Sequence, residues 1–235
     1  MSTASDVLAA LDEVHDPEVD RPVTDMGFIR SVTEEAGQVR IVMQLPTYFC
    51  APNFTWLMVD DVRQAAEHVA GKGAVTVSVE DHFESERIQS GVQSRGGFMT
   101  AFPSEAEGDL EDLRDHFRRK TLLIRQEQVC RQLEEVGVDA ESLVDLVLGD
   151  VVRLDLPALG KYLTTREELG VGCRHDDPFL IAADGRPVGP EQVRAHRRSA
   201  RVMAVSFEGN GHLCKALLAE RYPSQLIPVD KGEVA

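Results

Sequence analysis

The hydrophobic period changes twice between residues 39 and 79, and this change constrains the fold more than any other feature. From Val39 to Leu45 every second residue is apolar, which predicts a half-buried β-strand. After Pro52 the apolar residues recur at spacings of three and four, which predicts a helix with one buried face. Alternation then returns at 74–80, so this helix should pack against one face of a sheet.

The residues before this segment complete a small domain. An apolar stripe at Val7, Leu11 and Val14 predicts a first helix. The segment 28–32 predicts a short strand, and a hairpin at 34–37 should join it to the strand that follows. The first 90 residues therefore predict the order helix, strand, strand, helix, strand, which is an α+β domain.

The rest of the chain has a different pattern of apolar residues. Residues 91–108 lose the periodicity and collect glycine and serine, which predicts a linker or an ordered loop. Helical spacing predominates in 109–235. It predicts a long helix that stops at Gly137 and further helices near 159–169, 191–207 and 213–222. A strand is predicted at 151–156 and a loop at 209–211. We therefore predict an α+β domain over 1–90 and a mostly α-helical domain over 109–235.

The composition limits the partners. A net charge of −15 disfavours nucleic acid and anionic membranes. The basic run 194–201, with four arginines, is expected to be a solvated helix face. The start of the chain carries acidic residues and no long apolar run, so we expect no secretory signal, no membrane span and a cytoplasmic location. In that compartment the four cysteines should be free thiols.

Cys50 lies where the predicted strand gives way to the predicted helix. If the helix begins near Pro52, the thiol lies at its positive end, an environment that favours the thiolate. A thiolate can bind a soft metal or attack an electrophile. A small buried hydrophobe is the third interpretation. The local sequence leaves these three uses open.

Several short motifs surround this cysteine in a fixed order. They are the turn Asp16-Pro17-Glu18, the segment 23–29 with Asp25 and Gly27, the strand 39–45, and the loop of Cys50 before a helix. In order and spacing they resemble the SufT/PaaD-like iron–sulfur assembly domain family over about a third of the chain. The resemblance implies that Cys50 is a transient ligand of an iron–sulfur cluster or iron, with Asp16 and Asp25 at the cofactor site.

Two positions of the loop depart from the family pattern. Pro46 occupies the place of the family's threonine and Thr47 follows one residue late. Ala51 replaces the proline after the cysteine, and Pro52 is again one residue late. The departures leave the fold prediction intact but change the loop, including any hydroxyl contact to a bound cluster.

The resemblance implies a non-enzymatic factor that matures a client metalloprotein, for example an oxygenase subunit. One thiolate falls short of the four ligands that clusters usually take, which favours transient transfer or a cluster shared across a homodimer. The alternatives are an adaptor or chaperone that binds an oxygenase subunit without carrying metal, and a thiol enzyme with His82 or His68 as base. For both residues a solvent-facing role is the plainer interpretation. For Asp16 and Asp25 the alternative role is a capped turn.

The predicted C-terminal domain contains two further pairs of metal-ligand residues. Cys173, His175, His212 and Cys214 have the composition of a tetrahedral zinc set. Each cysteine is only one residue from its histidine, which is not a zinc-motif spacing, and Cys214 shares a helical stripe with Leu218, which favours packing. Cys130 is expected in the core. The sequence contains no glycine-rich phosphate loop, nucleophile elbow or metalloprotease motif, so we predict no enzyme.

Overall fold

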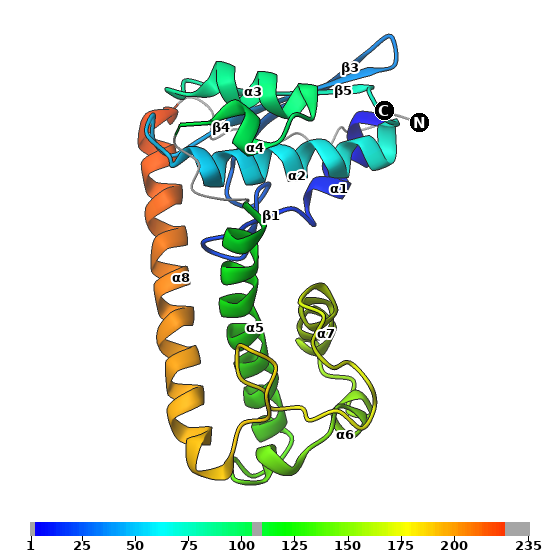
Figure 1. Ribbon diagram of the computed structural model, residues 1–235, viewed down its shortest axis with the longest axis vertical. Helices are drawn as coiled ribbons and strands as arrows, with labels where there is room; N and C mark the ends of the chain where they lie inside the picture. The colour runs from blue at the N-terminus through cyan, green and yellow to red at the C-terminus, as the bar shows by residue number, and fades with distance from the viewer. Residues whose placement is uncertain (1–2, 105–109, 224–235) are drawn as a thin grey trace, which may run out of the picture. The chain divides into compact units, whose positions relative to one another are not determined.

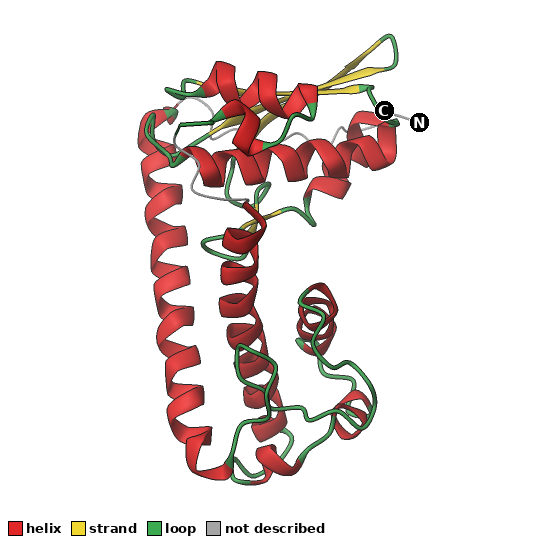
Figure 2. Cartoon of the chain, viewed as in Figure 1, coloured by secondary structure: helices red, strands yellow, loops and turns green. Residues whose placement is uncertain are grey.

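The computed structural model describes residues 3–104 and 110–223 (Figures 1 and 2). The chain divides into two compact units. Unit 1 comprises Met1–Leu110 and Gly209–Ala235, and unit 2 comprises Glu111–Glu208. The predicted α+β class is confirmed, with the strands in the N-terminal part and a mostly helical chain after it. No helix in the described ranges is long and apolar enough to cross a membrane.

Unit 1 is built on a small mixed sheet. Its first elements are α1 (Thr3–Leu11), β1 (His15–Asp16), β2 (Arg21–Pro22), β3 (Ile29–Glu35), β4 (Gln38–Gln44), α2 (Pro52–Ala70) and β5 (Val75–Glu80). Apart from the two-residue strands β1 and β2, this is the predicted order of elements. The sheet order is β3-β4-β5, with β3 antiparallel and β5 parallel to β4. The helix α2 forms the crossover between the two parallel strands, and α1 packs on it.

Local sequence explains the boundaries of these elements. The hairpin between β3 and β4 turns at Ala36 and Gly37, whose φ angles of 50° and 77° are those of a two-residue turn with left-handed backbone. The helix α2 is terminated by its C-cap residue Gly71, whose φ of 98° turns the backbone out of the helical conformation. The Gly71 N–H donates to the Glu67 carbonyl oxygen. Along β4 and β5 every second side chain is buried, as the alternation predicted.

Helices occupy the start of the predicted linker. The helices α3 (Ser85–Ser94) and α4 (Phe98–Ala101) cover most of the described part of 91–108, while residues 105–109 lie outside the described residues. Ile88 and Val92 are buried on one face of α3, and Phe102 stacks edge-on against Trp56 at 6.3 Å. The apolar repeat of α3 spans just over one turn, too short for its period to be recognised in the sequence.

Unit 2 consists of helices joined by turns. They are α5 (Leu110–Glu135, whose first residue belongs to unit 1), η1 (Ser142–Asp145), α6 (Leu148–Val152), α7 (Leu159–Glu168), η2 (Pro190–Gln192) and the first part of α8 (Val193–Arg221). The predicted strand at 151–156 was wrong, because Val151 lies in α6 and Asp155 turns the chain with a φ of 48°. The predicted loop at 209–211 was also wrong, because α8 is one helix through both glycines.

Ion pairs hold α5 to α8 within unit 2. Arg197 lies 2.7 Å from Glu127 and 2.6 Å from Glu134, and Arg201 also reaches Glu127 at 2.6 Å. Arg197 is only 5% exposed, so the expectation of a solvated basic face over 194–201 fails at this residue. Within this run, Arg197 and Arg201 pair with glutamates of the same unit.

Candidate cofactor-binding loop around Cys50

Cys50 lies in the loop that connects β4 to α2. The helix begins at Pro52, as predicted, and its N-cap residue Ala51 has extended backbone (φ −61°, ψ 129°) with no side-chain cap. Pro52 has no N–H and the Phe54 N–H donates to Asn53 Oδ1 at 2.9 Å, so the cysteine lies beside a helix start whose own residues satisfy part of its N–H groups. The thiol is partly exposed. Cys50 is thus placed at a helix N-terminus and can be reached from solvent.

A hydroxyl group faces the thiol from the same loop. Thr47 Oγ1 lies 3.3 Å from Cys50 Sγ, within hydrogen-bond distance of sulfur. The family's threonine position is held by Pro46, which is buried and has no hydroxyl. Thr47, one residue later, therefore supplies a hydroxyl to the sulfur although Pro46 occupies the family's threonine position.

His82 holds the loop through its backbone. Its Nε2 lies 2.8 Å from the Cys50 carbonyl oxygen, to which it donates, while its Nδ1 accepts the Glu84 N–H at 3.2 Å. Both ring nitrogens are thus committed in one neutral tautomer. Burial lowers the pKa of His82, which keeps the ring neutral.

A thiol enzyme would need His82 or His68 as a base for Cys50. His82 is only 4% exposed, so the expected surface role is wrong for it. Its Nε2 proton is donated to the Cys50 carbonyl and its one lone pair, on Nδ1, accepts the Glu84 N–H, so His82 positions the loop and has no free lone pair for the sulfur's proton. His68 is exposed on α2, as expected.

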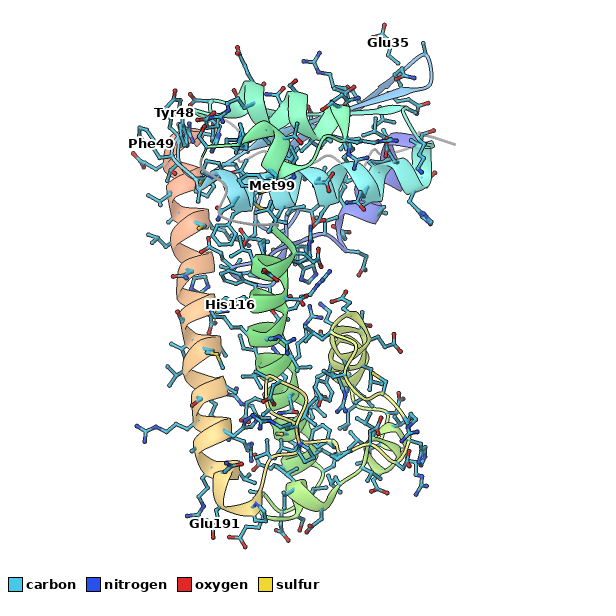
Figure 3. The ribbon with its side chains drawn as sticks, in the orientation of Figure 1. Glu35, Tyr48, Phe49, Met99, His116 and Glu191 are labelled. Atoms are coloured by element: carbon cyan, nitrogen blue, oxygen red, sulfur yellow. The ribbon has the colours of Figure 1, made fainter. Side chains whose placement is uncertain are left out.

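Three aromatic rings flank the cysteine. Tyr48 and Phe49 precede it, and Phe83 follows His82. The ring centroids lie 4.9 Å apart for Tyr48–Phe49, 5.8 Å for Phe49–Phe83 and 6.2 Å for Tyr48–Phe83. Tyr48 is 44%, Phe49 75% and Phe83 42% exposed, and Figure 3 shows Tyr48 and Phe49 near the C-terminal end of α8. We call these three residues the aromatic cluster. The sequence analysis missed it, because Phe83 meets the other two only in the folded chain.

The two predicted acidic site residues have different roles. Asp16 is buried and accepts the Glu18 N–H at 2.8 Å, which is the capped turn that was the alternative prediction. Burial raises the pKa of Asp16 to about 6. Asp25 pairs with Arg21 at 2.6 Å and Lys215 at 3.0 Å. Burial is the largest single effect and raises its pKa, but the hydrogen bonds and charges of Lys215 and Arg21 together outweigh it and lower the pKa. The Asp25 carboxylate is thus already held by two protein cations.

The predicted zinc residues are divided between the two units. Cys173 and His175 belong to unit 2, whereas His212 and Cys214 belong to unit 1. Both histidines and Cys173 are exposed, and His212 is two residues from Cys214 on α8, so the two side chains point to different sides of the helix. In the described residues, no three or more His, Cys, Asp and Glu side chains are grouped for a metal ion. Cys130 is fully buried, as expected.

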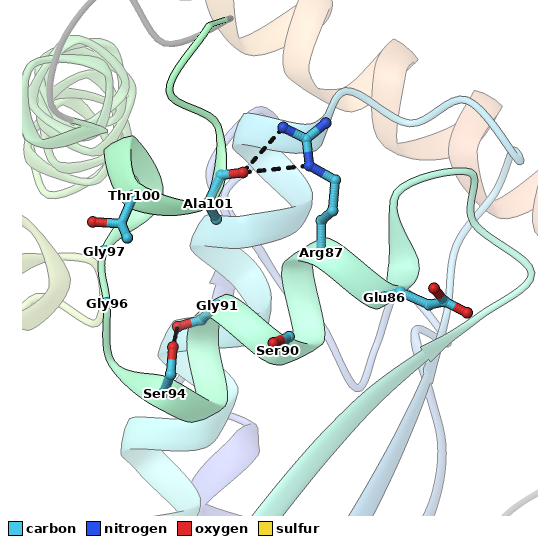
Figure 4. A pocket seen from close by; sticks show the side chains of 9 residues that line it. All are labelled: Glu86, Arg87, Ser90, Gly91, Ser94, Gly96, Gly97, Thr100 and Ala101. Carbon is cyan, nitrogen blue, oxygen red and sulfur yellow. Dashed lines mark hydrogen bonds between the residues drawn. The ribbon is translucent and has the colours of Figure 1, made fainter.

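A separate hollow lies between α3 and α4. Its volume is about 430 Å³, and its lining includes Ser90, Ser94, Gly97 and Thr100 (Figure 4). Arg87 at its edge donates to the Ala101 carbonyl oxygen at 3.0 and 3.3 Å. The lining contains no thiol and no imidazole, so this hollow does not offer soft ligands.

Comparison with known proteins agrees with the motifs. Residues 4–79 match the model of a family described as "Iron-sulfur cluster assembly protein". No curated protein and no solved structure matches the chain. The predicted resemblance is confirmed for this segment, which runs from α1 to β5 and contains Cys50. The match supports a role in iron–sulfur cluster assembly.

Proposed function

We propose that the protein is a non-enzymatic assembly factor that helps to insert an iron–sulfur cluster or iron into a client metalloprotein, with Cys50 as a transient ligand. The observation that carries the proposal is the partly exposed thiol two residues before α2, inside the segment that matches the assembly family. A thiolate is the form that binds iron, and backbone N–H groups at a helix N-terminus favour that anion.

The surroundings of the thiol fit holding and release better than turnover. Within the described residues the polar side-chain atom at hydrogen-bond distance from the sulfur is Thr47 Oγ1, at 3.3 Å, and His82 has no free lone pair. A nucleophilic cysteine would need a base within reach of its proton. A transfer ligand needs only a reachable sulfur that can exchange with a client's own ligands.

The aromatic cluster supports a protein client. Exposed apolar patches beside a site commonly mark where another protein binds, and aromatic residues carry much of the energy of such contacts. The client's ligands would have to come close to Cys50, and Tyr48 and Phe49 stand directly beside it in the chain. We propose an oxygenase subunit as one such client. A client-specific adaptor that carries no metal is the second candidate, because the same cluster would serve it.

Anaerobic reconstitution with iron and sulfide tests the carrier proposal. Wild type is expected to take up both and to show thiolate-to-iron absorbance, which Cys50→Ser should lose. Cys173→Ser is the matched control, because that thiol is exposed and belongs to unit 2. Equal iron and sulfide content in wild type and Cys50→Ser would refute the carrier proposal.

Transfer to a client separates the two candidates. Phe49→Ser removes a ring that is 75% exposed, so the fold should be retained. We expect this variant to keep the iron of reconstituted protein but to release it more slowly to an apo-acceptor. If Cys50→Ser promotes client maturation as well as wild type does, while Phe49→Ser does not, the adaptor is correct and the carrier is wrong.

A further inference from the structure

The aromatic cluster beside Cys50 is an apolar surface that the described residues leave open to water. Phe49 is 75%, Tyr48 44% and Phe83 42% exposed. The rings contact one another, and Phe83 also meets the His82 ring at 5.0 Å between centroids. Soluble proteins rarely expose several large apolar side chains together unless another segment or molecule binds there. The cover of this cluster therefore lies outside the described residues or on another molecule.

The last turn of α8 is fixed next to both segments that carry these rings. Arg221 Nη1 donates to the Leu45 carbonyl oxygen at 2.9 Å, and its Nη2 donates to the Asp81 carboxylate at 2.5 Å. Leu45 is three residues before Tyr48, and Asp81 is two residues before Phe83. The described residues end at 223, two residues after this anchor. The segment that follows therefore starts beside the aromatic cluster.

The sequence after residue 223 begins with an uncharged stretch that contains an apolar run. Residues 226–229 are Leu-Ile-Pro-Val, and the first charged residue is Asp230. The run lies five to eight residues after Arg221, a reach of up to about 17 to 27 Å in an extended chain, so it is long enough to meet the rings. Proline-containing apolar segments suit aromatic surfaces, because proline has little chain entropy left to lose. Burying an uncharged run also requires no ion to leave water.

We propose that residues 226–229 dock on the aromatic cluster and cover the Cys50 loop, so that this segment of the chain competes with the client for the cluster. The client in this inference rests on the proposed function, whereas the docking of the segment does not. A segment tethered by a few residues acts at an effective concentration on the order of 1 mM, so a weak contact is enough to keep the rings covered. A client that binds the same rings more tightly displaces the segment, which opens Cys50 when the client is present.

Alkylation of Cys50 tests the docking without any metal. On the full chain, Leu226→Ser together with Ile227→Ser shortens the apolar run without adding a charge near the thiol. A segment docked in about nine molecules of ten slows the reaction about 10-fold, so iodoacetamide should label Cys50 about 10-fold faster in this double variant than in wild type. Val234→Ser is the matched control, because it makes the same kind of change outside the run. Equal rates in wild type and the double variant would overturn the proposal.

Coupling to Phe49 shows whether the run acts through the rings. In the Phe49→Ser background, the double substitution should change the alkylation rate by less than about 2-fold, because the ring that the run contacts is gone. The full 10-fold effect in that background would contradict docking on the cluster. A free peptide of residues 222–235 should slow the labelling of Cys50 in the double variant. A wild-type rate that depends on protein concentration would mean that a second copy covers the cluster, and the proposal would be wrong.

The docking and the proposed function fail on different outcomes. If the run slows the alkylation of Cys50 while iron and sulfide uptake is the same in wild type and Cys50→Ser, the docked segment stands and the carrier function falls. If the double substitution leaves the alkylation rate unchanged while Cys50→Ser loses uptake, the carrier stands and the docked segment falls. Ring-proton NMR signals of Tyr48, Phe49 and Phe83 give a measurement that does not involve the thiol. They should shift in the double variant and not in Val234→Ser, and unchanged signals would refute the docking.

Discussion

Replacing Asp16 by asparagine should stabilise unit 1 at neutral pH. The carboxylate is 7% exposed, and burial raises its pKa from 3.8 to about 6. A raised carboxyl pKa means that the native state binds the proton more tightly than the unfolded state does, so stability is lost as pH rises from about 4 through 6. Two pKa units correspond to about 3 kcal/mol, an upper bound for the gain above pH 7. Asparagine keeps an oxygen to accept the Glu18 N–H.

Trp56 provides the assay, because it is the single tryptophan and lies in α2 of unit 1. Urea unfolding followed by its fluorescence should show Asp16→Asn more stable than wild type at pH 7.5 and equal to it at pH 3.5. Asp6→Asn is the matched control, since Asp6 is exposed in the first turn of α1 and its loss should give no gain at either pH. A gain that is the same at both pH values, or a loss at pH 7.5, would refute the assignment of the cost to a buried charge.

Four further substitutions test packing and hydrogen bonding. Gly91→Ala should destabilise unit 1 by about 1–3 kcal/mol in urea unfolding, because a Cβ there would lie 2.5 Å from the Trp56 ring. Gly209→Ala, with open space around it, should stabilise α8 by about 0.5–1 kcal/mol. A loss of stability in Gly209→Ala would mean that α8 breaks there. Arg166→Met should cost about 3 kcal/mol or more in calorimetry, since the buried guanidinium donates to three carbonyl groups, of which those of Gly172 and Pro178 would lose this donor while Phe179 O keeps the Tyr162 hydroxyl; a cost under about 1 kcal/mol would contradict this. His82→Ala should cost about 1–3 kcal/mol equally at pH 7 and 8, because the ring is already neutral, and a strong pH dependence in that range would show that it is charged.

The parts of the fold that could be predicted are those whose pattern is local. Alternation along β4 and β5 and the four-residue repeat of α2 each extend over enough residues to show their period, and the positions of Pro52 and Gly71 mark the helix ends. The prediction failed where the pattern is short or misleading. The repeat of α3 is too brief, and two glycines inside α8 resemble a loop although the helix continues through them.

The candidate site also has a part that the local sequence predicts and a part that it does not. Cys50 could be found because its position depends on one strand and one helix that are adjacent in the sequence. The contact of His82 with the Cys50 carbonyl joins residues 32 apart, and that of Arg221 with Leu45 joins residues 176 apart. Such pairings follow from strand register and helix docking, which no single sequence pattern encodes. The Asp25 carboxylate, predicted as a ligand, pairs with Lys215 at 3.0 Å, a contact between residues 190 apart that the sequence does not show.

The contacts of α8 also show that the matched segment alone is not the whole of unit 1. The family match ends at residue 79, whereas the cations that hold Asp25, Leu45 and Asp81 come from residues 215–221. Asp25 and Asp81 are exposed, with 44% and 61% of their side chains accessible, so each of these ion pairs adds at most about 1 kcal/mol to the link between the N-terminal fold and the end of α8. An acidic residue in a family motif can therefore be retained for docking a helix rather than for binding a cofactor.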